Sequence, residues 1–240
     1  MFEDKILFFD FDGTIANTEM YHKIAARKAL EHFGIRADIS LYYGRGKSNR
    51  EIFTEMQNNL KIEIPIDEII ALKTSLFKKV AVDLCPYAGM EKMVKSLPNR
   101  KFVITKNEQD IVFSFLKKWD MRKYFENIIS LSASSLTKSE MIIKTSISPK
   151  NCVLFDDVFT TVINAIDNGI QGVLVENGKV KTITNEDWMD NLAWDVKAYW
   201  LAGICNKAAM ESEDNKMVKM EFWKDWLDSE YDGSARKMRF

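Results

Sequence analysis

The chain has 240 residues, of which 46% are hydrophobic and 29% charged, a composition typical of a globular protein. Its formal net charge of −1 gives no electrostatic basis for binding nucleic acid or an anionic membrane. Cys85, Cys152 and Cys205 lie too far apart for a zinc or CxxC motif, and no apolar run reaches membrane-spanning length. Because Glu3 and Asp4 stand where a signal peptide would be basic, we expect a cytoplasmic protein.

Short runs of apolar residues without alternation recur along the chain. They lie at 5–9, 101–105, 152–155 and 172–175, with a weaker fifth run at 127–131. Strands of a parallel sheet have this pattern because helices cover both of their faces. Apolar residues at helical spacing lie between these runs. The alternation predicts an α/β fold with a Rossmann-like, doubly wound parallel sheet.

The long stretch between the first and second of these runs lacks strand character. Apolar residues at helical spacing predict three helices there, near residues 21–33, 52–60 and 69–80. We therefore expect a catalytic core of residues 1–15 and 84–184, with a helical cap of residues 16–83 inserted after the first strand.

The composition changes again after Asn185, where tryptophan becomes frequent. One helical stripe there is apolar, and the pattern predicts a helical C-terminal extension over residues 185–240. The stripe would pack on the core or form a homodimer, whereas the acidic residues mixed through it disfavour a membrane surface. The stripe consists of Trp188, Leu192, Val196, Trp200 and Ile204.

Polar side chains follow three of the predicted strands at the points where they end. Ligands of open α/β sheets bind at the carboxyl ends of the strands, so we expect these side chains to converge on one rim. Carboxylates gathered there repel one another unless they are protonated or bind a cation. An all-oxygen site favours Mg²⁺ with phosphate oxygens beside it. The residues at the strand ends are Asp10, Asp12, Thr105, Lys106, Asn107, Asp156 and Asp157, and Lys138 joins them from a segment predicted as a loop that leads into a helix.

The motif DFDGT at residues 10–14 resembles the first motif of the haloacid dehalogenase superfamily of aspartate-nucleophile phosphotransferases. Thr105, Lys138 and the pair Asp156-Asp157 follow in that family's order with suitable spacing. Over about residues 5–176 the chain is similar to the β-phosphoglucomutase-like and phosphoglycolate phosphatase-like members with a helical cap. The resemblance implies a Mg²⁺-dependent phosphoric monoester hydrolase that acts on small phosphorylated metabolites.

The resemblance also implies a role for each motif residue. Asp10 would attack phosphorus to form an aspartyl phosphate, and Asp12 would act as general acid and then as general base. Thr105 and Lys138 would hold and neutralise the phosphoryl oxygens. The metal ligands would be Asp10, the backbone carbonyl of Asp12, Asp156 and Asp157. The substrate-binding positions would be Gly13, Thr14, His22, Lys106 and Asn107.

The acidic pair departs from the family's commoner form, in which Gly-Asp precedes a second acid four residues later. That later position is Thr161 here, and the Asp-Asp pair resembles the Glu-Asp of β-phosphoglucomutase-like members. We therefore assign the metal to both acids, with more weight on Asp157. A structural role for Asp156, paired with a lysine, is the alternative. Lys106 also stands where a small residue is usual, and its role is open.

The segment GRGKSNR at residues 44–50 contains Gly-Lys-Ser but does not match a nucleotide-binding loop. The first glycine of such a loop would fall at Leu41, and no core strand precedes it. Two interpretations stay open: a turn between cap helices, or a basic edge of the cap that meets the substrate's phosphate.

Two other functions are considered. A phosphomutase would share the aspartyl phosphate, but the basic residue expected just after Gly-x-Ser is Asn49, with Arg50 one place late. A histidine at the position of His22 occurs both in mutases and in phosphatases of this cap type, so His22 does not decide between the two functions. A non-catalytic binding protein on the same fold is the other alternative. The predicted partner is a small phosphorylated metabolite, and we expect neither nucleic acid nor membrane.

Overall fold

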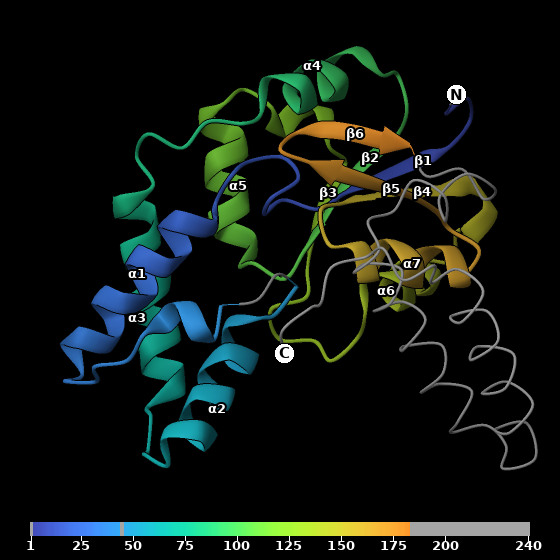
Figure 1. Ribbon diagram of the computed structural model, residues 1–240. Coiled ribbons are helices and arrows are strands. Elements are labelled where there is room, and N and C mark those ends of the chain that lie inside the picture. Colours follow the sequence, from blue (N-terminus) through green and yellow to red (C-terminus); the bar gives the residue numbers. More distant parts are fainter. Residues whose placement is uncertain (1, 44–45, 183–240) are drawn as a thin grey trace, which may run out of the picture. The chain divides into compact units, whose positions relative to one another are not determined.

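The computed structural model describes residues 2–43 and 46–182, and these residues contain a six-stranded sheet in the order β3-β2-β1-β4-β5-β6 (Figure 1). Neighbouring strands from β3 to β5 run parallel, whereas β6 pairs with β5 in the antiparallel sense. The strands are β1 (Ile6–Phe9), β2 (Lys101–Thr105), β3 (Asn127–Ser130), β4 (Cys152–Asp156), β5 (Gln171–Glu176) and β6 (Lys179–Thr182). The predicted α/β class and the five predicted parallel strands are confirmed.

The sixth strand was missed because it is an edge strand with the sequence KVKT, which contains no apolar run. It follows β5 through a tight turn in which Asn177 has φ 50° and Gly178 has φ 72°. Two positive φ angles are typical of the Asn-Gly turn of a β-hairpin. The Asn177-Gly178 dipeptide was therefore the sequence feature that could have predicted this hairpin.

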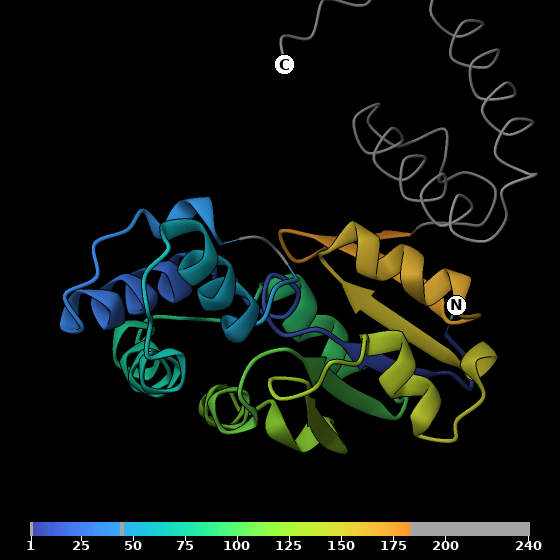
Figure 2. The same ribbon diagram turned by 90° about the horizontal axis from the view of Figure 1, so that it is seen from below.

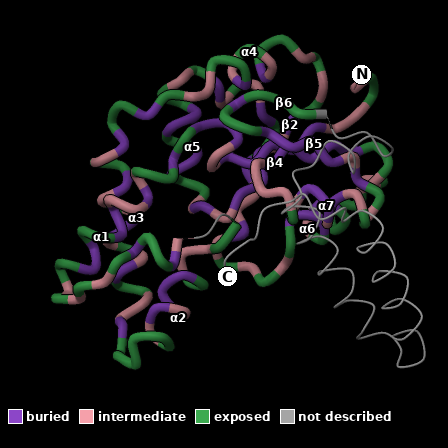
Figure 3. The backbone as a smooth tube through the Cα atoms, viewed as in Figure 1, coloured by how far each residue is buried: buried purple, intermediate pink, exposed green. Residues whose placement is uncertain are grey.

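Different helices cover the two faces of the sheet, and this explains why the strands are apolar throughout. On one face, α4 (Ala88–Ser96) and α5 (Gln109–Lys118) pack against a cluster that includes Phe9 and Phe155. On the other face, α6 (Lys138–Lys144) and α7 (Phe159–Asp167) pack against a cluster that includes Phe8 and Leu154. Figures 1 and 2 show α4 and α7 on opposite sides of the sheet, and Figure 3 shows the buried strands between them.

The helical cap consists of α1 (Glu19–His32), α2 (Asn49–Leu60) and α3 (Ile66–Val80), which lie beside the sheet (Figure 1). It has its own hydrophobic cluster, to which α1, α2 and α3 contribute Leu30, Phe53 and Ile69. Short 3-10 helices occupy η1 (Ile39–Leu41), η2 (Arg122–Tyr124) and η3 (Pro149–Asn151). The cap is thus confirmed as a region, while its boundaries at residues 16 and 83 stay a prediction.

The chain leaves the core for the cap and returns to it along adjacent paths. Ala16 forms isolated β-bridges with both Asp12 and Pro86. The Tyr87 N–H also donates to the Ile15 carbonyl at 2.8 Å. Both connections therefore lie beside the carboxyl end of β1, where the predicted site is centred.

The predicted C-terminal extension lies outside the described residues, as does its predicted role in dimer formation. Within the described part of the chain, none of the helices combines the length and hydrophobicity needed to cross a membrane.

Candidate active site

Three carboxylates meet at the carboxyl ends of two neighbouring strands. Asp10 follows β1, Asp156 is the last residue of β4, and Asp157 follows it. The strands pair in parallel with Phe9 opposite Phe155, so the residues after them lie side by side. Asp10, Asp156 and Asp157 each offer one oxygen, and these oxygens all lie within 4.8 Å of one another. The predicted convergence of acids on one rim is therefore present.

Lys138 is the cation inside this acidic cluster. Its Nζ lies 2.8 Å from Asp10 Oδ1 and 2.6 Å from Asp156 Oδ2. It is the first residue of α6, and the capping box between Thr137 and Glu140 fixes the start of that helix. Although burial alone would lower the pKa of the Lys138 ammonium, the charges of Asp10 and Asp156 raise it above its ordinary value. Lys138 is therefore a permanent cation of the site.

One lysine does not balance three carboxylates, of which Asp10 and Asp156 are buried and Asp157 is half-buried. Burial raises the pKa of Asp10 well above its usual range, and the charges of Asp156, Asp12 and Asp157 act in the same direction against Lys138. A divalent cation would remove this repulsion. The cluster offers only oxygen ligands, which suits Mg²⁺. The residues thus fit the predicted metal.

Gly13 is required by both its backbone and its surroundings. Its φ of +79° lies in the region that favours glycine. A Cβ at this position would also lie only 2.2 Å from Asp157 Oδ2. Glycine therefore lets Asp157 approach the chain just after the first two aspartates.

Asp156 is fully buried, and both of its oxygens accept hydrogen bonds. Oδ2 accepts from Lys138, and Oδ1 accepts from the Val158 N–H at 2.8 Å. These contacts are those expected if Asp156 holds Lys138 in place. It still belongs to the cluster that could hold a metal.

Asp12 is held by three hydrogen bonds that all end on Oδ1. The donors are Thr18 Oγ1 at 2.7 Å, His22 Nε2 at 2.9 Å and Asn107 Nδ2 at 3.3 Å. Burial alone would raise the pKa of Asp12, but its interactions with His22, Thr18 and Lys73 lower it below the ordinary value. Asp12 is therefore stabilised as a carboxylate in this arrangement.

Thr18 and His22 reach Asp12 together because they stand one helical turn apart at the start of α1. His22 was a predicted site residue, whereas Thr18 was missed because threonine before a helix is an ordinary capping residue. The His22 ring stacks on Phe77 of α3, with ring centroids 4.1 Å apart. Burial and the nearby charge of Lys73 lower the pKa of His22, so its imidazole is neutral at pH 7.

Lys73 of α3 was not predicted to belong to the site. It is 1% exposed, and its Nζ lies 2.8 Å from His22 Nδ1 and 2.6 Å from Asn49 Oδ1. Because Nδ1 accepts a hydrogen bond from Lys73, His22 carries its proton on Nε2. This Nε2–H donates a hydrogen bond to Asp12. Burial lowers the pKa of Lys73 to about 8. A lysine on the apolar face of α3, between Ile69 and Phe77, was the sequence signal that could have identified it.

Thr105 and Asn107 lie where predicted, at the end of β2. The buried Thr105 hydroxyl accepts from the Asn107 N–H at 3.0 Å, and the Asn107 side chain reaches Asp12. Lys106, whose role was open, reaches across to the cap, where its Nζ lies 3.1 Å from Glu51 Oε2 of α2.

Thr14 is fully buried, and its hydroxyl has no hydrogen-bond partner among the residues that the structure describes. It follows Gly13 at the turn where the chain leaves the core. Its hydroxyl is therefore available to bond a group that the described residues do not supply.

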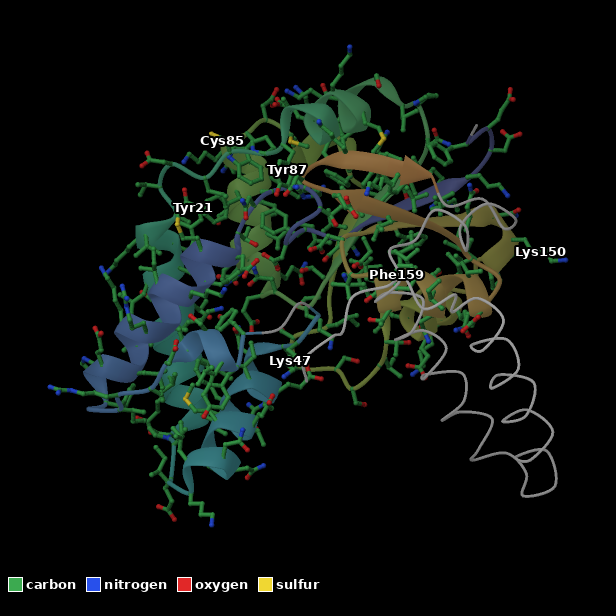
Figure 4. The ribbon with its side chains drawn as sticks, viewed as in Figure 1. Tyr21, Lys47, Cys85, Tyr87, Lys150 and Phe159 are labelled. Carbon is green, nitrogen blue, oxygen red and sulfur yellow. The ribbon has the colours of Figure 1, made fainter. Side chains whose placement is uncertain are left out.

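A pocket of about 140 Å³ lies between the cap and the core. Its lining includes side chains of both charges, and within it Ser132 Oγ donates to Glu108 Oε2 at 3.0 Å. The cap contributes Asn49, Arg50 and Ile70, and the core contributes Lys106, Glu108, Ser132 and Ala133. In Figure 4, the labelled Lys47 lies just before α2, and the labelled Phe159 is the first residue of α7 in the core.

The described part of the segment at residues 44–50 forms the start of α2. Ser48 caps the helix in a capping box with Glu51, and Lys47 pairs with Glu55 of the same helix. Arg50 pairs with Asp67 of α3. These contacts favour a helix-initiating turn. Gly44 and Arg45 lie outside the described residues.

Comparisons with known proteins place this geometry in context. The sequence model of a family described as "haloacid dehalogenase-like hydrolase" matches residues 7–175. Fructose-1-phosphate phosphatase YqaB of Escherichia coli is 25% identical over 160 residues, which are 63% of this chain and 85% of that protein.

Two solved structures have a similar fold. One, described as a putative phosphoglycolate phosphatase from Lactobacillus plantarum, has a TM-score of 0.60 and 17% identity, covering 75% of this chain and 94% of that one. The other, a putative β-phosphoglucomutase from Thermotoga maritima, has a TM-score of 0.52 and 20% identity, covering 78% of this chain and 97% of that one.

Proposed function

Because the chain belongs to the haloacid dehalogenase-like hydrolases, we propose that it is a Mg²⁺-dependent phosphatase of small phosphorylated sugars. The membership confirms the predicted superfamily and hydrolase class. The observation that carries the proposal is the gathering of Asp10, Asp156 and Asp157 around Lys138, next to an Asp12 that is held by three donors.

In the first half of the proposed reaction, a carboxylate oxygen of Asp10 attacks phosphorus and the bond from phosphorus to the leaving oxygen breaks. The product on the protein is an aspartyl phosphate. Asp12 must first take up a proton against its lowered pKa, and it then transfers this proton to the leaving alkoxide. Lys138, 2.8 Å from Asp10 Oδ1, stabilises the negative charge of the phosphoryl oxygens. Thr105 and Thr14 contribute hydroxyl groups toward the same oxygens.

In the second half, Asp12 takes a proton from water as that water attacks phosphorus. The bond between Asp10 and phosphorus breaks, inorganic phosphate leaves, and Asp10 returns as a carboxylate. All three hydrogen bonds to Asp12 end on Oδ1, so we assign the proton exchange to Oδ2. His22 and Lys73 position Asp12 for both halves.

A bound Mg²⁺ would supply Lewis-acid charge neutralisation to the phosphoryl group. We assign its ligands to Asp10, Asp157 and the backbone carbonyl of Asp12. Asp156 would contribute less, because its two oxygens already accept from Lys138 and the Val158 N–H.

A small, hydroxylated leaving group suits the pocket between the cap and the core. Its polar and charged side chains can exchange hydrogen bonds with sugar hydroxyls, while Ile70 and Ala133 can contact the carbon skeleton. The Escherichia coli relative is by name a fructose-1-phosphate phosphatase, which supports sugar phosphates as the first substrates to try.

The direct test is phosphate release from p-nitrophenyl phosphate and fructose 1-phosphate, with Mg²⁺ and after its removal by a chelator. We expect turnover only with Mg²⁺, and a loss of at least about a thousandfold in Asp10→Asn. The matched control is Asp110→Asn, which changes an aspartate of a surface ion pair with Lys78. Turnover that survives both metal removal and Asp10→Asn would refute the proposal. An intact protein without turnover would instead favour a binding function.

A further inference from the structure

Tyr43 carries a buried hydroxyl whose bonding capacity is unused. Among the described residues, no group lies within hydrogen-bond reach of this oxygen. A buried hydroxyl without a partner is unfavourable because it has lost its water without replacement. The hydroxyl of Tyr43 can therefore bond a group that the described residues do not supply.

The position of Tyr43 links it to the catalytic aspartates. Its ring lies 6.5 Å from the ring of His22, with an angle of 25° between their planes. His22 in turn donates to Asp12. Three residues further along, a Cβ on Gly46 would lie 3.4 Å from the side chain of Val158, which directly follows Asp157. Tyr43 and Gly46, the described residues on either side of positions 44–45, thus lie near His22 and near the residue after Asp157, respectively.

Tyr42, the preceding residue, is buried within the hydrophobic cluster of the cap, and Tyr43 packs against the same cluster. Tyr43 in addition places its ring beside that of His22. Tyr42 is therefore a matched control for the packing that the two tyrosines share.

The phenol of Tyr43 stays protonated at the pH where the enzyme would work. Burial, and then the negative charge of Asp12, raise the pKa of Tyr43 above its ordinary value. A neutral phenol can donate one hydrogen bond and accept others. It is a weak ligand for Mg²⁺, which prefers carboxylate and phosphate oxygens.

The remaining candidates are the two halves of a phosphate ester. The phosphoryl half would lie on the core, against Asp10 and Lys138. The leaving group would lie near Asp12, which protonates it, and Tyr43 lies beside His22, which donates to the same aspartate. The leaving group is therefore the half of the ester that we assign to the Tyr43 hydroxyl.

We propose that Tyr43 is a specificity residue, whose hydroxyl forms a hydrogen bond with a hydroxyl or carbonyl oxygen carried by the leaving group close to the ester bond. This inference rests on the proposed phosphatase function and deepens it. The preferred substrates are phosphate esters of polyols, and simple alkyl esters lack the group that Tyr43 contacts.

Two small esters test the inference without knowledge of the natural substrate. Hydroxyethyl phosphate and ethyl phosphate differ only in one hydroxyl near the ester bond. We expect the wild-type protein to have the higher kcat/KM on hydroxyethyl phosphate. Tyr43→Phe should lower that value about threefold to tenfold, the effect of one neutral hydrogen bond, and leave ethyl phosphate unchanged.

Tyr42→Phe is the matched control and should keep the wild-type ratio between the two esters. Thermal unfolding checks folding, and Tyr43→Phe should not lower Tm because it removes an unpartnered buried hydroxyl.

An unchanged ratio in Tyr43→Phe, or an equal loss on both esters, would overturn the inference. Failure of the wild type to release phosphate from these two esters and also from p-nitrophenyl phosphate and fructose 1-phosphate would refute the proposed function and this inference with it. That result is distinct from turnover without selectivity.

Discussion

The core and the cap each bring one buried lysine to the site, and the two have opposite electrostatic environments. Lys138 of the core lies between Asp10 and Asp156, whose charges raise its pKa. Lys73 of the cap has two uncharged partners, His22 and Asn49, and burial lowers its pKa to about 8. The core lysine thus balances charge, whereas the cap lysine orients a neutral imidazole.

This difference suggests a division of labour between the two regions. The core contributes charges that would act on the phosphoryl group, and they are compensated only in part. The cap contributes hydrogen-bonding groups that reach the site through Asp12, the acid expected to handle protons. Substitutions of the lysines should therefore have unlike effects.

The largest effect is expected from Lys138→Met. This substitution leaves Asp10 and Asp156 buried without their cation, which should lower kcat about a hundredfold to a thousandfold. The lost pairing should also lower the free energy of unfolding by about 3–5 kcal/mol when Mg²⁺ is absent. Phosphate release and urea denaturation measure the two effects.

Lys144→Met, on the exposed end of the same helix, is the control and should behave as the wild type. A Lys138→Met protein with wild-type kcat would show that Lys138 is not needed for charge balance.

Lys73→Met should change the pH dependence of stability. The pKa of Lys73 falls from 10.5 in the unfolded chain to about 8 in the folded one. Below pH 8 the lysine is charged in both states, so the folded state bears the full desolvation penalty. Between pH 8 and 10.5 the folded state loses its proton first, the unfolded state binds more protons, and the unfolding free energy rises with pH.

Across that range the unfolding free energy of the wild type should therefore rise by about 3 kcal/mol relative to that of Lys73→Met. Urea denaturation at several pH values measures this difference, and groups that titrate in both proteins cancel. The control is Lys79→Met, at an exposed position of α3, and its unfolding free energy should change with pH as that of the wild type does. Parallel curves for Lys73→Met as well would contradict the lowered pKa.

The smallest effect is expected from Lys106→Met. This lysine pairs with Glu51 across the gap between core and cap, but both side chains are partly exposed to solvent. Exposed ion pairs contribute about 0–1 kcal/mol, so Tm should change little. If Lys106 only steadies the cap, KM should rise by no more than about threefold. A loss as large as that of Lys138→Met would instead place Lys106 among the groups that act on the phosphoryl group.

The sequence predicted where the core residues of the candidate site lie, because parallel topology determines where strand ends meet. Asp10, Thr105 and Asp157 each follow an apolar run, and adjacent parallel strands bring such residues to one rim. Lys138 needed the family resemblance as well, since it begins a helix and does not follow a strand.

The cap residues of the site were predicted less well, because helical periodicity indicates which face of a helix is buried but not which residues pack against that face. Lys73, Asn49 and Tyr43 lie on different segments of the cap, and only their packing brings them toward His22. Their roles depend on contacts between residues far apart in the sequence. The role of Asp156 was left open for a similar reason, because the motif does not indicate which groups its carboxylate contacts.

The central claim is that Asp10 becomes transiently esterified by the substrate's phosphoryl group. Borohydride reduces an aspartyl phosphate to homoserine, which mass spectrometry of the digested protein can locate. We predict homoserine at residue 10 when Mg²⁺ and a hydrolysable phosphate ester are both present, and unmodified Asp10 when either is left out. Turnover with no reduced residue, or with homoserine at another aspartate, would contradict the account.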